Sequence, residues 1–421
     1  MTTTPSPGHL DAAESASRPV SRRLMAAIAF AQFGLFVALL TPVIVSLTLR
    51  VNAVVGDGEG RAGALGLILG VGAFFALAAN PFFGHLSDRT TSRMGMRRPW
   101  LAVGTVGGVA GLAIIGVAES VPMLLVGWCV TQTFFNCVLA VLVALLSDQV
   151  PLLQRGRVSG LMGVGQIVGV TVGAALADVF TGDPLLLMVG PAVVLLVAVP
   201  ILMSVLPDRR LDPADRPPFS VRTAAATFVF NPRRNPDFGW AWLSRFLGFY
   251  GVATILSFQG LYLGTRLDVP DEDLAGTVFQ FQMVQNPCII AAALLAGFLS
   301  DRVGRRKLWV LGASLVQAAG LGTLAFAPNL PAVLAGAVIT GLAMGVFVSV
   351  ELALAVNVLP DPATAAKDLG VYNIANAAPQ SVAPAVGPAL IAAGGFGLLF
   401  LGSSAIAAAG GAAIMKIKGR K

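Results

Sequence analysis

Long apolar runs, each close to twenty residues, fill most of this 421-residue chain and constrain its fold more than any other feature. A run of about 20 apolar residues crosses a bilayer as a helix, because lipid offers the backbone no hydrogen-bond partner. The sequence therefore predicts an all-α membrane protein with twelve transmembrane helices. The predicted spans are residues 22–49, 62–86, 100–118, 121–148, 158–180, 184–206, 238–264, 275–299, 308–326, 330–358, 369–393 and 395–415.

The composition excludes a water-soluble domain. Hydrophobic residues make up 56% of the chain, charged residues only 12%, and the mean hydropathy is +0.81. A soluble domain carries about 25% charged residues. Too little charge is left to cover a water-exposed surface, and the lipid bilayer is the expected partner of most of the surface.

Basic residues concentrate in alternate connecting segments, such as residues 89–98, 209–234 and 302–307. Cytoplasmic loops of membrane proteins carry such an excess of Lys and Arg. The pattern predicts a multi-pass protein of the cell membrane with both termini in the cytoplasm. The net charge of +7 is explained in this way, and no nucleic-acid partner is expected.

The chain divides into two helical halves and three polar segments. The predicted divisions are a disordered cytoplasmic tail at 1–20, a six-helix half at 21–206, a cytoplasmic linker at 207–237, a second six-helix half at 238–415, and a basic tail at 416–421.

The two halves share a sequence repeat. The second span ends in G-H-L-S-D-R at residues 84–89, and the eighth ends in G-F-L-S-D-R at residues 297–302. A basic turn follows each, G-M-R-R-P-W at 95–100 and G-R-R-K-L-W at 304–309. Repeated halves of this kind place a shared site near the bilayer midplane, between the halves.

Residues 84–98 resemble the signature loop between the second and third helices of the major facilitator superfamily. The extended pattern, from S-D-R-T at 87–90 to R-P-W at 98–100, is similar to the glycoside/hexuronide cation symporters and the sucrose-type proton symporters. The resemblance implies a secondary transporter that works by alternating access, usually as a monomer.

The repeated loops predict a conformational latch. Helix N-termini beside Asp88 favour an anion there, and Arg98 is expected to reach Asp148 when the two halves close on the cytoplasmic side. The alternative is that the loops only obey the charge rule for cytoplasmic segments. The candidate latch residues are Gly84, Asp88, Arg89, Arg98, Asp148, Gly297, Asp301, Arg302 and Arg305.

Two charged residues stand out within the predicted spans, Glu351 in the tenth and Arg245 in the seventh. Charges at membrane depth are costly and usually functional. Their similar depths predict an ion pair between them. Glu351 has three possible roles: to exchange a coupling proton, to contact the solute, or to hold two helices together in a permanent pair.

Uncharged polar residues form stripes at helical spacing in several spans. Amides hydrogen-bond in both directions without net charge, which suits a neutral polyhydroxylated solute. The alternative is that they bond across packed helices. The predicted cavity residues are Gln32, Gln132, Asn136, Gln166, Gln285, Asn286, Tyr372, Asn373, Asn376 and Gln380, and Gln282 lies beside this set.

The expected function is proton- or cation-coupled uptake of a sugar or a similar neutral polar solute. The alternative is a proton-driven exporter of drugs or metabolites. Gly165, Gly169 and Gly173 lack the Gly-Pro pattern that exporters of this superfamily tend to show in the fifth span, which favours uptake. A polytopic membrane enzyme is a remote alternative, because no cluster of catalytic residues is evident. No cofactor or metal is expected.

Overall fold

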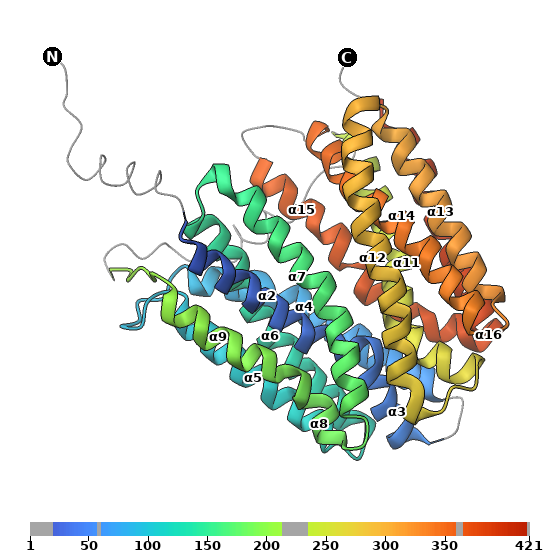
Figure 1. The fold of residues 1–421 in the computed structure, drawn as a ribbon, viewed down its shortest axis with the longest axis horizontal. Coiled ribbons are helices and arrows are strands. Elements are labelled where there is room, and N and C mark those ends of the chain that lie inside the picture. The colour runs from blue at the N-terminus through green and yellow to red at the C-terminus, as the bar shows by residue number, and fades with distance from the viewer. Residues whose placement is uncertain (1–19, 57–59, 213–234, 359–364, 419–421) are drawn as a thin grey trace.

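The computed structural model describes residues 20–56, 60–212, 235–358 and 365–418, and these form a bundle of long helices (Figure 1). The first half begins with α2 (Arg22–Thr41), which continues through a short π-helical stretch, Pro42–Ser46, into α3 (Leu47–Val55). The rest of this half consists of α4 (Gly60–Ser87), α5 (Arg98–Gly116), α6 (Val121–Gln149), α7 (Leu152–Val179), α8 (Pro184–Val189) and α9 (Val193–Val205).

The second half repeats the plan. It consists of α11 (Pro236–Arg266), α12 (Asp271–Val303), α13 (Arg306–Phe326), α14 (Leu330–Asn357), α15 (Ala365–Ala377) and α16 (Pro379–Met415). The predicted tail at 1–20, apart from Val20, and most of the predicted linker at 207–237 lie outside the described residues.

Eleven helices within the described residues are long and apolar enough to cross a membrane, and the last of them is a 46-residue stretch, Gly370–Met415. That stretch holds the two final predicted spans, because its backbone leaves helical geometry at Gly394 and Gly395. Gly395 has φ +66°, a conformation that favours glycine. A Cβ on Gly402 would lie 3.8 Å from Leu390 Cδ1, so the two arms run side by side. The prediction of twelve spans agrees with this arrangement.

Several helices run beyond the apolar runs that predicted them. α7 begins at Leu152, six residues before the predicted start, and α12 begins at Asp271, four residues before it. Backbone hydrogen bonding favours continuing a helix past the hydrocarbon core, since hydropathy limits only the part within lipid.

Glycines let helices approach closely within the first half. Gly165, Gly169 and Gly173 of α7 face α2, where a Cβ on Gly173 would lie 2.0 Å from Thr41 Oγ1. A Cβ on Gly108 of α5 would lie 2.1 Å from the Phe135 ring on α6. A larger residue at Gly173 or Gly108 would force the facing side chain or its helix to shift.

The halves meet at the end of the molecule that holds α3, away from the start of α2 (Figure 1). Asn52 Nδ2 donates to Asp271 Oδ1 across this junction at 2.8 Å. Deeper in the bundle, Asn286 Nδ2 of α12 donates to Thr171 Oγ1 of α7 at 2.7 Å. Towards the opposite end of α7, a Cβ on Gly160 or Gly163 would meet no atom within 4 Å. The contact between the halves is therefore tighter at the α3 end.

Candidate functional site

A central cavity of about 380 Å³ lies between the two halves. This volume is in the range of small-molecule sites. α7 supplies most of its wall from the first half, and α11, α12 and α14 supply most from the second. The polar side chains in its lining are Gln166, Arg245, Gln282, Gln285, Asn286, Gln317, Thr340, Asn376 and Gln380.

Five of the predicted cavity residues line this cavity: Gln166, Gln285, Asn286, Asn376 and Gln380. They come from α7, α12, α15 and α16, four helices that are far apart in the sequence. Gln132 lies next to it, because it shares a small void of about 30 Å³ with Gln380.

The other predicted cavity residues lie elsewhere. Gln32 is buried in α2, and Asn136 Nδ2 donates to the Gln132 carbonyl one turn earlier at 2.9 Å. Tyr372 packs on Phe238, and Asn373 is exposed without lining the cavity. Helical spacing identifies residues that share a face, but it does not say which face the neighbouring helices leave open.

Two lining residues were missed from the sequence, Gln317 of α13 and Thr340 of α14. Gln317 is the only amide in its predicted span, and Thr340 carries a hydroxyl, so neither belongs to a stripe of amides. Gln285 Nε2 donates to Thr340 Oγ1 at 3.0 Å, a contact between helices that no local pattern encodes.

The charged part of the site is a pair of residues on α11 and α14. Arg245 Nη1 donates to Glu351 Oε2, as the sequence predicts. Glu351 is fully buried, whereas 11% of the Arg245 side chain is exposed and lines the cavity. The guanidinium also lies 5.0 Å from the Phe249 ring centroid and 4.8 Å from that of Tyr372. Cation–π contacts of this kind hold the guanidinium independently of the carboxylate.

Several buried polar atoms around the cavity lack a hydrogen-bond partner in the described part of the chain. These are both amide atoms of Gln282, Gln317 Oε1, Arg245 Nε and Glu351 Oε1. Gln282 is 1% exposed. A buried polar atom without a partner costs about 1–3 kcal/mol. The cavity wall is therefore suited to a guest with several hydrogen-bonding groups.

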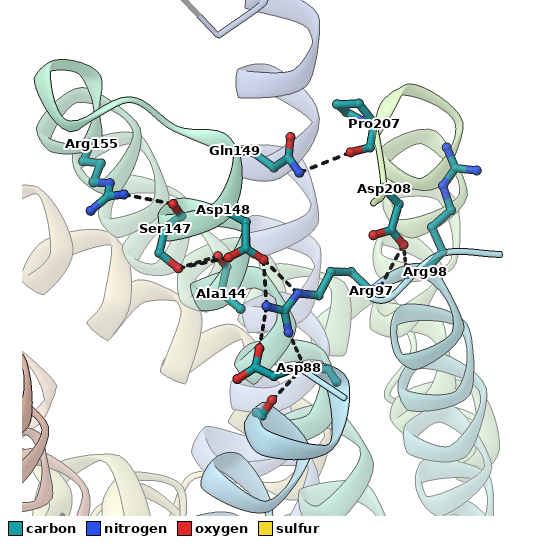
Figure 2. A network of polar contacts seen from close by, with 12 residues as sticks. Asp88, Arg97, Arg98, Ala144, Ser147, Asp148, Gln149, Arg155, Pro207 and Asp208 are labelled. Atoms are coloured by element: carbon teal, nitrogen blue, oxygen red, sulfur yellow. Dashed lines mark hydrogen bonds and ion pairs between the residues drawn. The ribbon is translucent and has the colours of Figure 1, made fainter. Parts of the chain in front are cut away.

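A second polar network ties together the ends of the first-half helices that carry the basic loop (Figure 2). Arg97 is its centre, with Nη2 at 2.6 Å from Asp88 Oδ1 and 2.7 Å from Asp148 Oδ2. Arg97 Nη1 also donates to Ser87 Oγ. The guanidinium therefore joins the ends of α4 and α6 through two carboxylates.

The predicted contact between Arg98 and Asp148 is wrong. Arg98 is the first residue of α5, and its Nη2 donates to the Leu206 carbonyl at the end of α9, at 2.6 Å. The backbone N–H groups of Arg97 and Arg98 both donate to Asp208 Oδ2 at 2.8 Å. This turn directs the two neighbouring arginine side chains to opposite sides, and Arg97 is the one that reaches Asp148.

The observed contacts lie within one half. Asp88, Arg97, Asp148 and Asp208 all belong to the first half. Gly95 permits the turn, since it has φ +104° and a Cβ there would lie 2.3 Å from Asp208 Oδ2. The network joins helices within one half.

The remaining candidate latch residues have fewer described contacts. Arg302 places its guanidinium 4.1 Å from the Phe298 ring centroid, and Arg305 is exposed just before α13. A Cβ on Gly84 or Gly297 would meet no atom within 4 Å. Arg89 is half-buried, and the side chain of Asp301 lies outside the described residues.

Comparison with known proteins gives matches along most of the chain. A model of the Major Facilitator Superfamily matches residues 23–284 and 272–420. The cis,cis-muconate transport protein of Acinetobacter baylyi is 28% identical over 279 residues, which cover 61% of this chain and 62% of that protein. The multidrug transporter mfsC of Aspergillus fumigatus is 32% identical over 119 residues, 28% of this chain and 23% of that protein. The chain thus matches less than two thirds of the length of either relative.

Solved structures share the fold at low identity. The nucleoside transporter NupG has a TM-score of 0.74 and 13% identity, covering 94% of this chain and all of that one. The human organic anion transporter MFSD10 has a TM-score of 0.68 and 16% identity, also covering 94% of this chain and all of that one.

Proposed function

Because the chain belongs to the major facilitator superfamily, we propose that it moves a small polar solute through the central cavity, coupled to a proton. The two halves, 21–206 and 238–415, would rock around the cavity and open it to each side of the membrane in turn. Both termini face the cytoplasm of a cell-membrane protein in this proposal, in line with the distribution of basic residues.

The observation that carries the proton coupling is the Arg245–Glu351 pair at the cavity wall. Glu351 is fully buried, and the partner recorded for it lines the cavity. Ionisable residues inside the membrane mark proton pathways in many transporters. A proton on Glu351 would cancel its charge and release Arg245, so solute binding and proton binding would act on the same guanidinium.

The cavity wall supports a solute that is polar but not wholly hydrophilic. Seven amide side chains line it, and each can donate and accept hydrogen bonds. Apolar residues such as Phe249, Leu256, Ile289 and Met344 lie between them. The sugar predicted from the sequence would satisfy the amides. The named relatives transport muconate, drugs, nucleosides or organic anions, a range that supports a small solute without selecting one class.

Export is the second candidate. The apolar part of the wall favours it, because exporters of drugs need contacts with apolar solutes. The narrower resemblance to glycoside/hexuronide and sucrose-type symporters favours uptake. Both directions use the same cavity and the same ion pair.

We also propose that the Arg97 network makes the first half a rigid body during transport. It connects the ends of α4, α5, α6 and α9, and 51% of the Asp88 side chain stays exposed. The Asp88 carboxylate would contact helix N-termini of the second half when the halves close at the end of the molecule that holds the Arg97 network. The same role in closing the two halves is proposed for the equivalent residues of the second half, Gly297, Asp301, Arg302 and Arg305.

The test is uptake into proteoliposomes of a panel with a sugar, a nucleoside, muconate and a lipophilic dye, with and without an inward proton gradient. We expect gradient-driven accumulation by the wild type and only passive exchange by Glu351→Gln. Glu119→Gln is the matched control, because Glu119 is exposed between α5 and α6 and away from the cavity. Accumulation by Glu351→Gln at the wild-type level would rule out coupling through this carboxylate.

A further inference from the structure

On the basis of the proposed transport, we infer that the solute carries a carboxylate. This carboxylate takes the place of Glu351 on Arg245 when Glu351 is protonated. One anionic solute and one proton would then cross together. The inference follows from the charges around the cavity, the fixed position of the guanidinium and the unpartnered atoms beside it.

Among the described residues, Arg245 is the only charged side chain that lines the cavity. A guanidinium offers five N–H donors in a planar fork that matches a carboxylate. Glu351 accepts a hydrogen bond from Arg245 through Oε2. Its Oε1 has no hydrogen-bond partner among the described residues, so only one carboxylate oxygen takes part in the pair. Arg245 Nε likewise has no hydrogen-bond partner among the residues that the structure describes. The guanidinium therefore keeps donors that Glu351 does not use.

The position of the guanidinium does not depend on Glu351. Phe249 lies one turn after Arg245 on α11, while Tyr372 comes from α15. Their ring centroids lie 5.0 and 4.8 Å from the guanidinium carbon. When Glu351 is neutral, these two rings still hold the cation at the cavity wall. A site prepared in this way loses little entropy on binding an anion.

The surroundings of Glu351 are apolar on the neighbouring helices. Val350, the residue before Glu351 on α14, belongs to a buried apolar cluster with Ala296 of α12, Val310 and Ala313 of α13, and Phe238 of α11. The ionisable side chains on α11, α12, α13 and α15, other than Arg245, are Asp237, Tyr250, Tyr262, Arg266, Asp271, Glu272, Asp273, Cys288, Asp301, Arg302, Arg306, Lys307, Lys367, Asp368 and Tyr372. Of these, Tyr372 contacts the guanidinium, Arg302 lies over Phe298, and Lys307 donates to the Ile417 carbonyl.

The charge balance then selects an anion. The pair is neutral while Glu351 is ionised, and protonation leaves a single positive charge on Arg245 inside the membrane. Uncompensated charge at this depth is costly. A neutral solute would leave that cost in place, whereas a carboxylate removes it. The proton comes from the water on the open side, resides on Glu351 and leaves with the solute on the other side.

The other residues that line the cavity indicate the chemistry of the remainder of this solute. Gln282 and Gln317 present amide atoms without recorded partners, and Ile167 and Val170 of α7 form an apolar wall from the other half. With a volume of about 380 Å³, the cavity fits a small organic acid that combines one apolar portion with further hydrogen-bonding groups.

Thermal unfolding of purified protein tests the inference with aromatic and aliphatic monocarboxylates, dicarboxylates and the primary amide of each acid. Glu351→Gln leaves Arg245 without its carboxylate, and the double variant Arg245→Gln/Glu351→Gln removes both charges, which avoids an unpaired buried ion. We expect carboxylates to raise the unfolding temperature of Glu351→Gln more than that of the wild type. The double variant and the amides should show no such rise.

The pH dependence gives an independent measurement. Because one proton is linked to binding, the affinity of the wild type should increase by up to about tenfold per pH unit as the pH falls through the titration of Glu351. Glu351→Gln should bind the same acids without this dependence. Amides or sugars that bind as well as carboxylates, binding that survives in the double variant, or a panel in which no carboxylate stabilises the protein would each overturn the inference.

The outcomes separate the inference from the proposed function. Gradient-driven uptake of a neutral solute, abolished by Glu351→Gln, would keep the proposed function and overturn the carboxylate. Carboxylate binding that needs Arg245, without uptake driven by a proton gradient, would support the anion site and reject proton coupling.

Discussion

At the scale of single residues, Arg97 is the centre of a charged network at the ends of α4 and α6. It is 4% exposed and contacts Asp88, Asp148 and Ser87, whereas its neighbour Arg98 donates to a backbone carbonyl. A guanidinium that contacts two carboxylates and a hydroxyl contributes more to stability than one that donates to a single carbonyl. Two adjacent arginines of the same loop therefore differ in importance.

The first prediction compares these two arginines. Arg97→Gln should destabilise the protein by about 2–4 kcal/mol, because the guanidinium loses its charged contacts with Ser87 and with two carboxylates that remain partly exposed to water. Arg98→Gln should cost about 1–2 kcal/mol, the value of one charged hydrogen bond. Urea unfolding in detergent micelles measures both. Equal losses for the two variants would contradict the central position of Arg97.

Gly95 is the second case at this scale. Gly95→Ala combines a φ of +104° with a Cβ 2.3 Å from the Asp208 carboxylate. We expect a loss of about 1–3 kcal/mol from backbone strain, with a further loss if Asp208 has to move. Gly84→Ala is the control, because open space surrounds that position, and its unfolding should match the wild type. Thermal unfolding of the two variants side by side gives the comparison.

Among the elements, α16 depends on one turn between its two arms. Gly394 has φ −166° and ψ 25°, and Gly395 has φ +66° and ψ −167°, a combination that is essentially restricted to glycine. The apolar pattern continues through this point, so only backbone conformation separates the last two spans. The turn places the second arm against α11 and α13.

Replacing Gly395 therefore tests the division of α16. Gly395→Ala should lower stability by about 1–3 kcal/mol, since alanine adopts this conformation only with strain. Gly402→Ala provides the control, because its Cβ would make an ordinary contact with Leu390 at 3.8 Å. Both are measured by thermal unfolding in micelles. A Gly395→Ala protein as stable as the control would mean that the turn tolerates a side chain.

For the whole molecule, the junction at the α3 end is one of the links between the halves. Asn52 and Asp271 are 2.8 Å apart there, and Gly260 of α11 would place a Cβ 3.0 Å from the Ile44 carbonyl of the first half. Alternating access requires such a junction to open in each cycle. The Arg97 network, within one half, has no such requirement.

Cross-linking tests this difference. Asn52→Cys/Asp271→Cys, treated with a short reducible thiol cross-linker, should lose transport and regain it when the linker is reduced. Gln149→Cys/Pro207→Cys is the control within the first half, where Gln149 Nε2 donates to the Pro207 carbonyl at 3.2 Å. Its transport should survive cross-linking. Unchanged uptake by the cross-linked Asn52/Asp271 protein would show that this junction does not open.

The sequence alone determined the membrane class, the two repeated halves, the spans and the pairing partners Arg245 and Glu351. These follow from hydropathy, charge and spacing along the chain, because a bilayer imposes the length of each span and penalises any unpaired charge. The signature at residues 84–98 added the family, and the family model confirms it.

Only the tertiary structure decided which faces of the helices surround the cavity. Gln317 and Thr340 line it, whereas Gln32 and Asn136 do not, since the rotation of each helix depends on how its neighbours pack. The choice of Arg97 over Arg98 depended on a turn around Asp208, a residue more than a hundred positions away. Local patterns carry no information about such long-range contacts, and those contacts assemble the site.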